Sequence, residues 1–323
     1  MIINMKLSQK IYQMFILGCR GGNLDYALSN GAGGVIFFSD DIQTIDGFKG
    51  LIADIKEKSI ITPFLSIDQE GGRVERTENI WGGKRYLSPK YAYEKGEKFL
   101  KSQTQNIADE LKEYGLNLNF APCCDTNTNP DNPIIGERAF SNTSEDVMRG
   151  GEIVLNVYKN NKIIPCIKHF PGHGDAKSDS HLTLPKIDLS MSEMENTHIK
   201  PFKYLISVGA EMVMVAHLHC TCFDKKIIPA SLSKNVIKYL KTFFNGVICS
   251  DDMVMSALDN YENACETAIR AGVNLFIYRY SDDETIKIIE NIIHKAEKDK
   301  ELQKCIDISF DKIIAIKEKY KII

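Results

Sequence analysis

The chain has 323 residues, of which 43% are hydrophobic and 9% aromatic, an ordinary composition for a globular protein with a sizeable core. Its formal net charge of −3 gives no basic surface of the kind that binds nucleic acid or an anionic membrane, so we expect neither partner. It has no apolar run of ~20 residues, no signal-peptide pattern at its start and no CxxC spacing among its nine cysteines, which together predict a soluble cytoplasmic protein.

Eight short, apolar, β-rich runs recur along the chain, at residues 13–19, 34–38, 63–68, 116–122, 163–170, 212–217, 246–252 and 274–279. Most are continuous rather than alternating, which is typical of strands buried on both faces of a parallel sheet. Amphipathic segments such as Phe48–Lys58 and Ser231–Phe244 separate them, and Ser231 or Ser233 can cap the second segment. This order predicts an α/β fold, a (β/α)8 TIM-like barrel.

Two further amphipathic segments follow the eighth run, at about residues 282–295 and 298–319. They predict a closing helix and a C-terminal helical extension, over about residues 282–323. Because no Ser/Gly/Pro-rich linker interrupts the chain, we expect one domain over residues 1–323. The alternative fold is a doubly wound open sheet, but no Gly-rich phosphate loop follows the first run.

Polar, chemically capable residues gather where the predicted strands end. The clusters are Asp68-Gln69-Glu70, Asp125, Lys168-His169, His217-Leu218-His219 and Asp251-Asp252. Active sites of barrels of this kind lie at the C-terminal ends of the strands. The sequence therefore predicts one site at that rim of the barrel.

Two loops contain charged residues that could act at this rim. In Ser66–Arg76, Asp68 stands at a strand end and could accept hydrogen bonds from two sugar hydroxyls, although a turn closed by a surface Asp–Arg pair is the alternative. The long loop Asn119–Ser141 ends in IGERAF, whose apolar flanks suggest a partly buried Arg138 that needs a partner. An internal ion pair with Glu137 is the alternative there.

The segment from Lys168 to His181, KHFPGHGDAKSDSH, contains three histidines within a Gly/Pro-broken loop. Asp179 and His181 are two positions apart, so the carboxylate can orient the imidazole and favour its charged form. This pair is suited to general acid–base catalysis.

The residues at the ends of two further predicted strands allow more than one role. His217 and His219 form a His-x-His that could suit a metal, but they project to opposite faces if the strand continues through both. In the segment Gly246–Leu258, Asp251 can point into the rim while Asp252 caps the following helix.

Four motifs in order, IDQEGGRV, NFAP-x-x-D with NPDNPIIGER, KHFPGHGD followed by DSH, and SDD, resemble glycoside hydrolase family 3, more narrowly its bacterial exo-β-N-acetylglucosaminidases. The resemblance runs from about Met14 to Arg279. It implies a retaining glycosidase in which Asp251 is the nucleophile, His181 the general acid/base and Asp179 its partner. The residues that match positions holding the terminal N-acetylglucosamine are Asp68, Arg76, Arg138, Lys168 and His169.

The resemblance implies no metal or cofactor, and it implies a small carbohydrate substrate, expected to be a peptidoglycan (muropeptide) fragment. The chain departs from many relatives by having one domain and by the loop TENIWGGKRYLSP after Arg76. Since a histidine does not repel an anion as a carboxylate does, phosphate could replace water, which makes a phosphorylase the main alternative. A metal-dependent hydrolase and a non-catalytic sugar-binding barrel are further alternatives.

Overall fold

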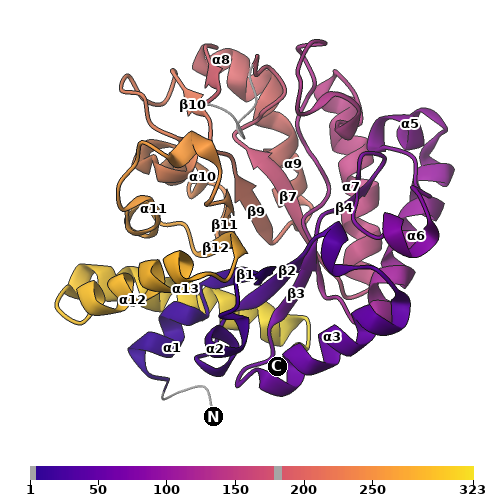
Figure 1. Ribbon diagram of the computed structural model, residues 1–323. Helices are drawn as coiled ribbons and strands as arrows, with labels where there is room; N and C mark the ends of the chain where they lie inside the picture. The colour runs from indigo at the N-terminus through magenta and orange to yellow at the C-terminus, as the bar shows by residue number, and fades with distance from the viewer. Residues whose placement is uncertain (1–4, 178–183) are drawn as a thin grey trace.

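Eight parallel strands close into a barrel in the computed structural model, which describes residues 5–177 and 184–323 (Figure 1). The barrel strands are β1 Phe15–Arg20, β2 Gly34–Phe37, β3 Phe64–Ile67, β6 Leu118–Asn119, β7 Ile164–Phe170, β9 Met212–Val215, β11 Val247–Asp252 and β12 Leu275–Tyr280. Their order around the barrel is β1-β12-β11-β9-β7-β6-β3-β2. Phe15 of the first strand pairs with Phe276 of the last, which closes the barrel and excludes the open sheet.

Helices surround the barrel, as the alternation of apolar runs and amphipathic segments predicts (Figure 1). The main ones are α2 Leu24–Ser29, α3 Ile45–Lys58, α6 Glu97–Tyr114, α7 Ser144–Asn160, α9 Lys200–Ser207, α10 Lys234–Leu240, α11 Ala264–Ala271 and α12 Asp283–Ala296. Of the two possible caps in Ser231–Phe244, Ser233 is the one that caps the helix, because its hydroxyl accepts from the Val236 N–H at 3.1 Å. Ser231 instead lies in the 3₁₀ turn η5 Ala230–Leu232.

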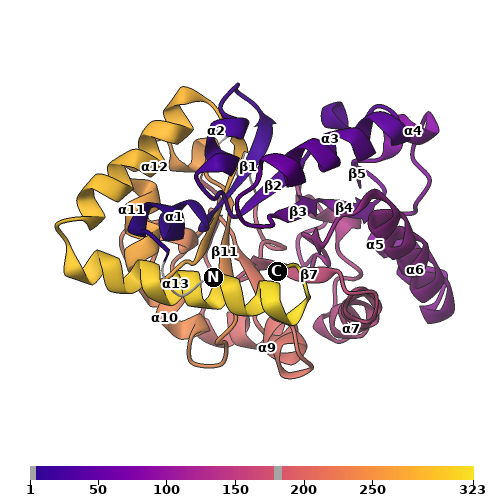
Figure 2. The same ribbon diagram turned by 90° about the horizontal axis from the view of Figure 1, so that it is seen from below.

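Two helices lie at the opposite end of the barrel from the predicted site. They are α1 Leu7–Tyr12 and α13 Lys300–Lys319. Helix α13 contacts α1, α11, α12 and β11, and Figure 2 shows it passing beneath the barrel with the two chain ends nearby. The two segments at about residues 282–295 and 298–319 lie in the helices α12 and α13.

Several short strands and helices that the sequence did not predict lie in the loops between the main elements. The strands β4 Gln69–Gly71 and β5 Val74–Glu75 pair antiparallel, and β8 Lys186–Ile187 and β10 His219–Cys220 pair parallel. The short helices are η2 Ser39–Asp41, α4 Glu78–Trp81, α5 Pro89–Glu94, η3 Gly136–Arg138, α8 Met191–Glu193, the π-helix η4 Met194–His198 and η6 Ser256–Leu258. Among the described residues, no helix is both long enough and apolar enough to span a membrane.

Candidate active site

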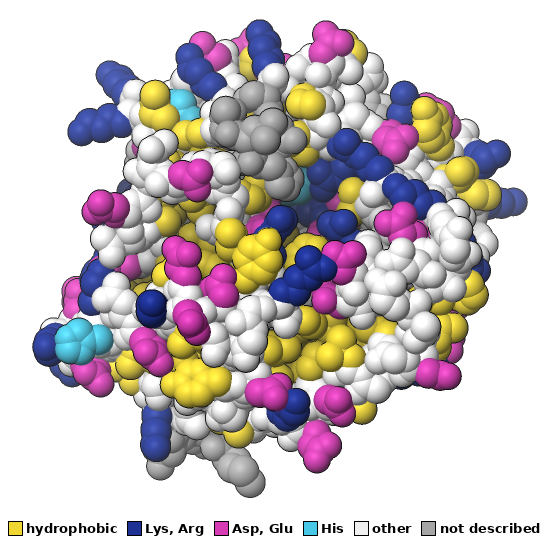
Figure 3. All heavy atoms as spheres, viewed as in Figure 1, with side chains coloured by type: hydrophobic (Ala, Val, Ile, Leu, Met, Phe, Trp, Pro, Cys, Tyr) yellow, Lys and Arg dark blue, Asp and Glu magenta, His cyan; other side chains and the backbone are white. Residues whose placement is uncertain are grey.

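A pocket of about 230 Å³ opens at the C-terminal ends of the barrel strands. Figure 3 shows a hollow on this face, bordered on one side by Lys and Arg side chains and on the other by hydrophobic ones. Its lining includes the predicted nucleophile and all five residues predicted to hold a sugar: Asp251, Asp68, Arg76, Arg138, Lys168 and His169. The fold therefore brings together residues up to 183 positions apart (68 to 251) at the predicted rim.

Buried Glu70 connects two of these residues. It accepts two hydrogen bonds from the Arg138 guanidinium, at 2.9 and 2.8 Å, and lies 2.6 Å from the Lys168 ammonium. Burial alone would raise the pKa of Glu70, but the two cations outweigh it and hold that pKa well below its usual range. Glu70, rather than the sequence neighbour Glu137, is the ion-pair partner of Arg138 in the structure.

Asp68 lies between two cations at the edge of the pocket. Its Oδ1 accepts from the Lys168 ammonium at 2.6 Å, and its Oδ2 is 3.8 Å from the Arg76 guanidinium. Burial works against the charge on Lys168, but Asp68 and Glu70 raise its pKa above the usual value. Lys168 is therefore a fixed positive charge, and Asp68 keeps carboxylate lone pairs facing the pocket for a ligand.

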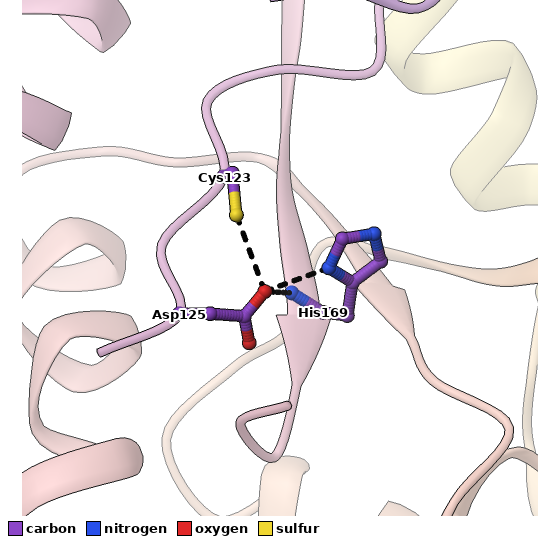
Figure 4. Close-up of side chains that lie close together, drawn as sticks. All are labelled: Cys123, Asp125 and His169. Atoms are coloured by element: carbon purple, nitrogen blue, oxygen red, sulfur yellow. Dashed lines mark hydrogen bonds and ion pairs between the residues drawn. The ribbon is translucent and has the colours of Figure 1, made fainter. Parts of the chain in front are cut away.

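His169 is oriented by a buried carboxylate, as Figure 4 shows. Its Nδ1 lies 2.7 Å from Asp125 Oδ2, and its Nε2 lies 3.3 Å from the Arg138 guanidinium. Because arginine can only donate, Nε2 is the acceptor and Nδ1–H donates to Asp125. Burial would raise the pKa of Asp125, but His169 and His173 hold it at about 2.

Cys123, Asp125 and His169 bring three possible metal-ligand atoms within 4.8 Å of one another (Figure 4). The Asp125 carboxylate, however, already accepts from the Cys123 thiol, from the backbone N–H and the ring Nδ1–H of His169 and from the backbone N–H of His173. Burial also raises the pKa of the Cys123 thiol well above its usual value, which favours the thiol over the metal-binding thiolate. These contacts describe a hydrogen-bonded network that fixes His169.

The His-x-His pair does not form a joint ligand set within the described part of the chain. His217 contacts the Ser231 hydroxyl at 2.7 Å and the Asp252 carbonyl at 3.2 Å. His219 contacts the Ile228 carbonyl at 3.3 Å, on a different loop. Each imidazole thus serves to fix a loop at the rim.

Asp251 and Asp252 face different surroundings. Burial would raise the pKa of Asp251, but the His169 and His217 imidazoles and the Asp252 N–H, at 2.8 Å from Oδ1, bring it to about 2. Asp251 is therefore an anion at the pocket. The expectation that Asp252 caps the next helix is wrong: it pairs with Arg279 and accepts from the Val254 N–H at 3.2 Å, because the chain turns here before η6.

Two arginines that line the pocket lie close to the same aromatic ring. The guanidinium carbons of Arg76 and Arg279 each lie 5.6 Å from the centre of the Phe38 ring. Arg73, also in the lining, is exposed and donates to the Pro133 carbonyl at 3.2 Å. These arginines line the pocket together with the carboxylates Asp68, Asp251 and Asp252, and Asp252 is the ion-pair partner of Arg279.

Two predicted residues, Asp179 and His181, lie outside the described residues, so their placement stays a prediction. Glu70 supports the pocket and His173 lines it, although neither was predicted as a site residue. Glu70 stands in the strand-end cluster Asp68-Gln69-Glu70, and His173 stands in the PGHG of the quoted motif.

The eight-stranded barrel, with a polar pocket lined by Asp68, Lys168 and Asp251 at the C-terminal ends of its strands, fits the class of glycoside hydrolase barrels. Residues 6–316 match the model of the "Glycosyl hydrolase family 3 N terminal domain", and the chain belongs to this family.

Relatives agree with this assignment. The chain is 30% identical over 271 residues to a beta-hexosaminidase of Psychromonas ingrahamii, covering 80% of this chain and 79% of that one. It is 29% identical over 269 residues to beta-hexosaminidase A of Pseudoalteromonas piscicida, covering 75% of this chain but only 45% of that enzyme. The solved family 3 beta-N-acetylglucosaminidase of Paenibacillus sp. FPU-7 superposes with a TM-score of 0.92 at 27% identity, over 99% of this chain and 63% of that one.

Proposed function

We propose that this protein is a retaining exo-β-N-acetylglucosaminidase that removes a terminal β-linked N-acetylglucosamine through a covalent glycosyl-Asp251 intermediate. The observation that carries the proposal is the presence of ionised Asp251 and the cluster of Asp68, Arg138 and Lys168 in one pocket. At about 230 Å³ the pocket is smaller than the roughly 300–1,000 Å³ of ordinary small-molecule sites, which suits a single sugar ring.

The proposed reaction has two steps. In the first, the Asp251 carboxylate bonds to the anomeric carbon while the bond to the leaving oxygen breaks, and His181 gives its proton to that oxygen. In the second, His181 takes a proton from water, whose oxygen displaces Asp251 and releases the sugar. Asp179 would orient His181 and favour its charged form. The roles of these two residues rest on their sequence motif.

The pairing of a carboxylate with an imidazole departs from the usual device of retaining glycosidases, which is a pair of carboxyl groups about 5–5.5 Å apart. The low pKa of Asp251 keeps the nucleophile charged at neutral pH. An imidazole, with an ordinary pKa near ~6.5, can donate and accept a proton in that range without the desolvation that a Glu would need.

The test is a panel of aryl β-glycosides. We expect the wild type to hydrolyse the N-acetyl-β-glucosaminide and to leave the β-glucoside nearly untouched. Asp251→Ala should lower kcat by at least about 10⁴-fold, as loss of other nucleophiles does. His181→Ala should slow substrates with poor leaving groups most, because these need the proton. Asp259→Ala, an exposed aspartate of the same loop outside the pocket, is the control and should change little.

A wild type that hydrolyses neither glycoside, or an Asp251→Ala variant that keeps its rate, would contradict the proposal. The first outcome would favour a non-catalytic sugar-binding barrel only if sugar still binds. Loss of activity in a chelator, restored by zinc, would instead favour the metal-dependent hydrolase.

We further propose a muropeptide fragment as the substrate, cleaved in the cytoplasm. Arg73, which lines the pocket and has no carboxylate partner among the described residues, favours a leaving group that carries carboxylates, as the lactyl and peptide parts of such fragments do. All nine cysteines are free thiols, which supports a reducing compartment. A higher kcat/KM for a GlcNAc–anhydromuramyl fragment than for neutral chitobiose would support this substrate, and the reverse order would contradict it.

The same arginine favours a second candidate, phosphorolysis. A phosphate ion near Arg73 could take the place of water in the second step and yield a sugar 1-phosphate. Product analysis separates the two reactions: N-acetylglucosamine alone in the presence of phosphate means hydrolysis, whereas its 1-phosphate means phosphorolysis.

A further inference from the structure

His173 is a buried histidine in the pocket lining for which the proposed mechanism has no role. Its side chain borders the same cavity as Asp251 and His169, and the His169 and His173 rings are centred 6.1 Å apart. The residue is only 2% exposed. Neither ring nitrogen has a hydrogen-bond partner among the described residues.

A buried imidazole without partners lowers the stability of the folded protein, because each polar nitrogen loses its hydrogen bonds to water. Such groups are rare in folded proteins. A ligand that supplies the missing bonds recovers this cost. The orphaned ring therefore indicates a group that arrives from outside the protein.

The backbone around His173 is fixed, so the ring does not lie there through loose packing. The backbone N–H of His173 donates to Asp125 Oδ1 at 2.6 Å. On either side, glycines allow close approach: a Cβ on Gly172 would lie 2.5 Å from the His198 Cβ, and one on Gly174 would lie 1.8 Å from the Thr126 carbonyl oxygen. The PGHG turn is thus pressed against two other segments.

The chemistry of the ring restricts the ligand. Burial lowers the pKa of His173 to about 4, so the imidazole is neutral near pH 7 and offers one N–H donor and one acceptor. A hydroxyl or an amide can use either nitrogen, whereas a carboxylate or phosphate could use only the donor. The ring also lacks the proton that a general acid needs at this pH.

We propose that His173 contacts the substrate directly and hydrogen-bonds a neutral group of the bound sugar, a ring hydroxyl or the acetamido group. This inference rests on the proposed function and adds to it a neutral contact beside the charged ones of Asp68 and Lys168. His173 is then a binding and positioning residue, distinct from the proposed acid/base His181.

The experiment compares His173→Phe, which keeps a planar ring and removes both nitrogens, with His173→Gln, which restores one polar end. His198→Phe is the matched control, because His198 is equally buried, also has an unpartnered Nδ1 and does not line the pocket. Binding of N-acetylglucosamine is measured by calorimetry. We expect a roughly tenfold weaker affinity for His173→Phe, the loss of about one neutral hydrogen bond, with partial recovery in His173→Gln.

Two readouts separate contact from a folding effect. The ¹⁵N chemical shifts of the His173 ring should move when sugar saturates the wild type, whereas those of His198 should not. With the aryl N-acetylglucosaminide, kcat/KM should fall at least tenfold while the pH profile of the remaining activity keeps its shape.

Affinity in His173→Phe equal to wild type, unchanged ring shifts, or an equal loss in His198→Phe would overturn the inference. If the wild type hydrolyses no N-acetylglucosaminide, the proposed function fails, yet the same binding comparison with glucose, galactose and their N-acetyl forms still tests His173. If none of these neutral sugars binds the wild type, the inference is overturned as well.

Discussion

Glu70 holds two of the cations that line the pocket, Arg138 and Lys168, in place without lining it itself. Its side chain has no exposed surface, and both carboxylate oxygens are used by Arg138 and Lys168. Those two cations in turn contact His169 and Asp68, which line the pocket. A single buried charge therefore sets the positions of four side chains that would face a sugar.

The first prediction concerns that charge. Glu70→Gln keeps the shape of the side chain but removes the counter-charge of two buried cations, so we expect the free energy of unfolding to fall by about 3–5 kcal/mol. We also expect KM for the N-acetylglucosaminide to rise at least tenfold, because Arg138 and Lys168 lose their fixed positions. Urea unfolding and steady-state kinetics measure the two effects. The control is Glu137→Gln, at the residue next to Arg138 in sequence, which should change the free energy of unfolding and KM only a little. A larger effect in this control would refute the assignment of Glu70 as the counter-charge.

At the scale of elements, the barrel could be predicted because strands buried on both faces appear in sequence as continuous apolar runs. The run at 116–122 shows the limit: only Leu118–Asn119 forms the strand β6. The Asn119 side chain then bonds the backbone of Gln69 in both directions, at 2.9 Å each. A side chain replaces part of the strand ladder there, which periodicity cannot reveal.

The sequence predicted residues of the pocket lining wherever a residue's chemistry is local to its motif, as for Asp68 or Asp251. It was not predicted where a partner is distant. Arg138 is adjacent to Glu137 in sequence, but it pairs with a glutamate 68 positions away. The role inferred for His173 depends on unfilled hydrogen bonds, which only the packing around the PGHG turn discloses. The small pairs β4–β5 and β8–β10 are likewise too short to leave a periodic pattern.

The second prediction tests the link between β6 and the site. Asn119→Ala leaves the Gln69 N–H and carbonyl without partners in a buried region, so we expect a loss of about 2–4 kcal/mol in the free energy of unfolding. Because Gln69 follows Asp68 directly, KM should rise as well. Asn117→Ala is the matched control: Asn117 makes similar bonds to Leu65 and Pro63, and neither it nor these partners lines the pocket. It should lower stability while leaving KM unchanged. Equal KM values for both variants would show that the link does not reach the site.

For the whole molecule, one buried lysine joins the last helix to the closed end of the barrel. The Lys317 ammonium in α13 donates to Gln13 Oε1 at 2.9 Å and to the Thr62 carbonyl at 3.0 Å. It also lies 4.7 Å from the centre of the Phe64 ring. These partners stand just before or at the start of β1 and β3, so Lys317 connects the C-terminal helix to the first half of the chain.

The third prediction follows from the fact that Lys317 has no carboxylate partner in the described part of the chain. Burial lowers its pKa from 10.5 to about 7. The folded protein therefore binds this proton more weakly than the unfolded chain does. The contribution of Lys317 to the free energy of unfolding should be lowest below about pH 7, where the lysine is protonated in both states and the folded protein holds a buried charge. It should rise between about pH 7 and 10.5, by up to about 1.4 kcal/mol per pH unit.

Lys317→Met removes this titration, so the variant should lose the upward slope of the free energy of unfolding with pH that the wild type shows in that window. Urea unfolding at about pH 7.5 and about pH 9.5 measures the slope for each protein. Lys319→Met is the control, because Lys319 lies two residues further along the same helix but is exposed and paired with Glu211. It should keep the wild-type slope. If Lys317→Met also keeps the wild-type slope, the buried Lys317 ammonium is not the group that makes the free energy of unfolding rise with pH in this window.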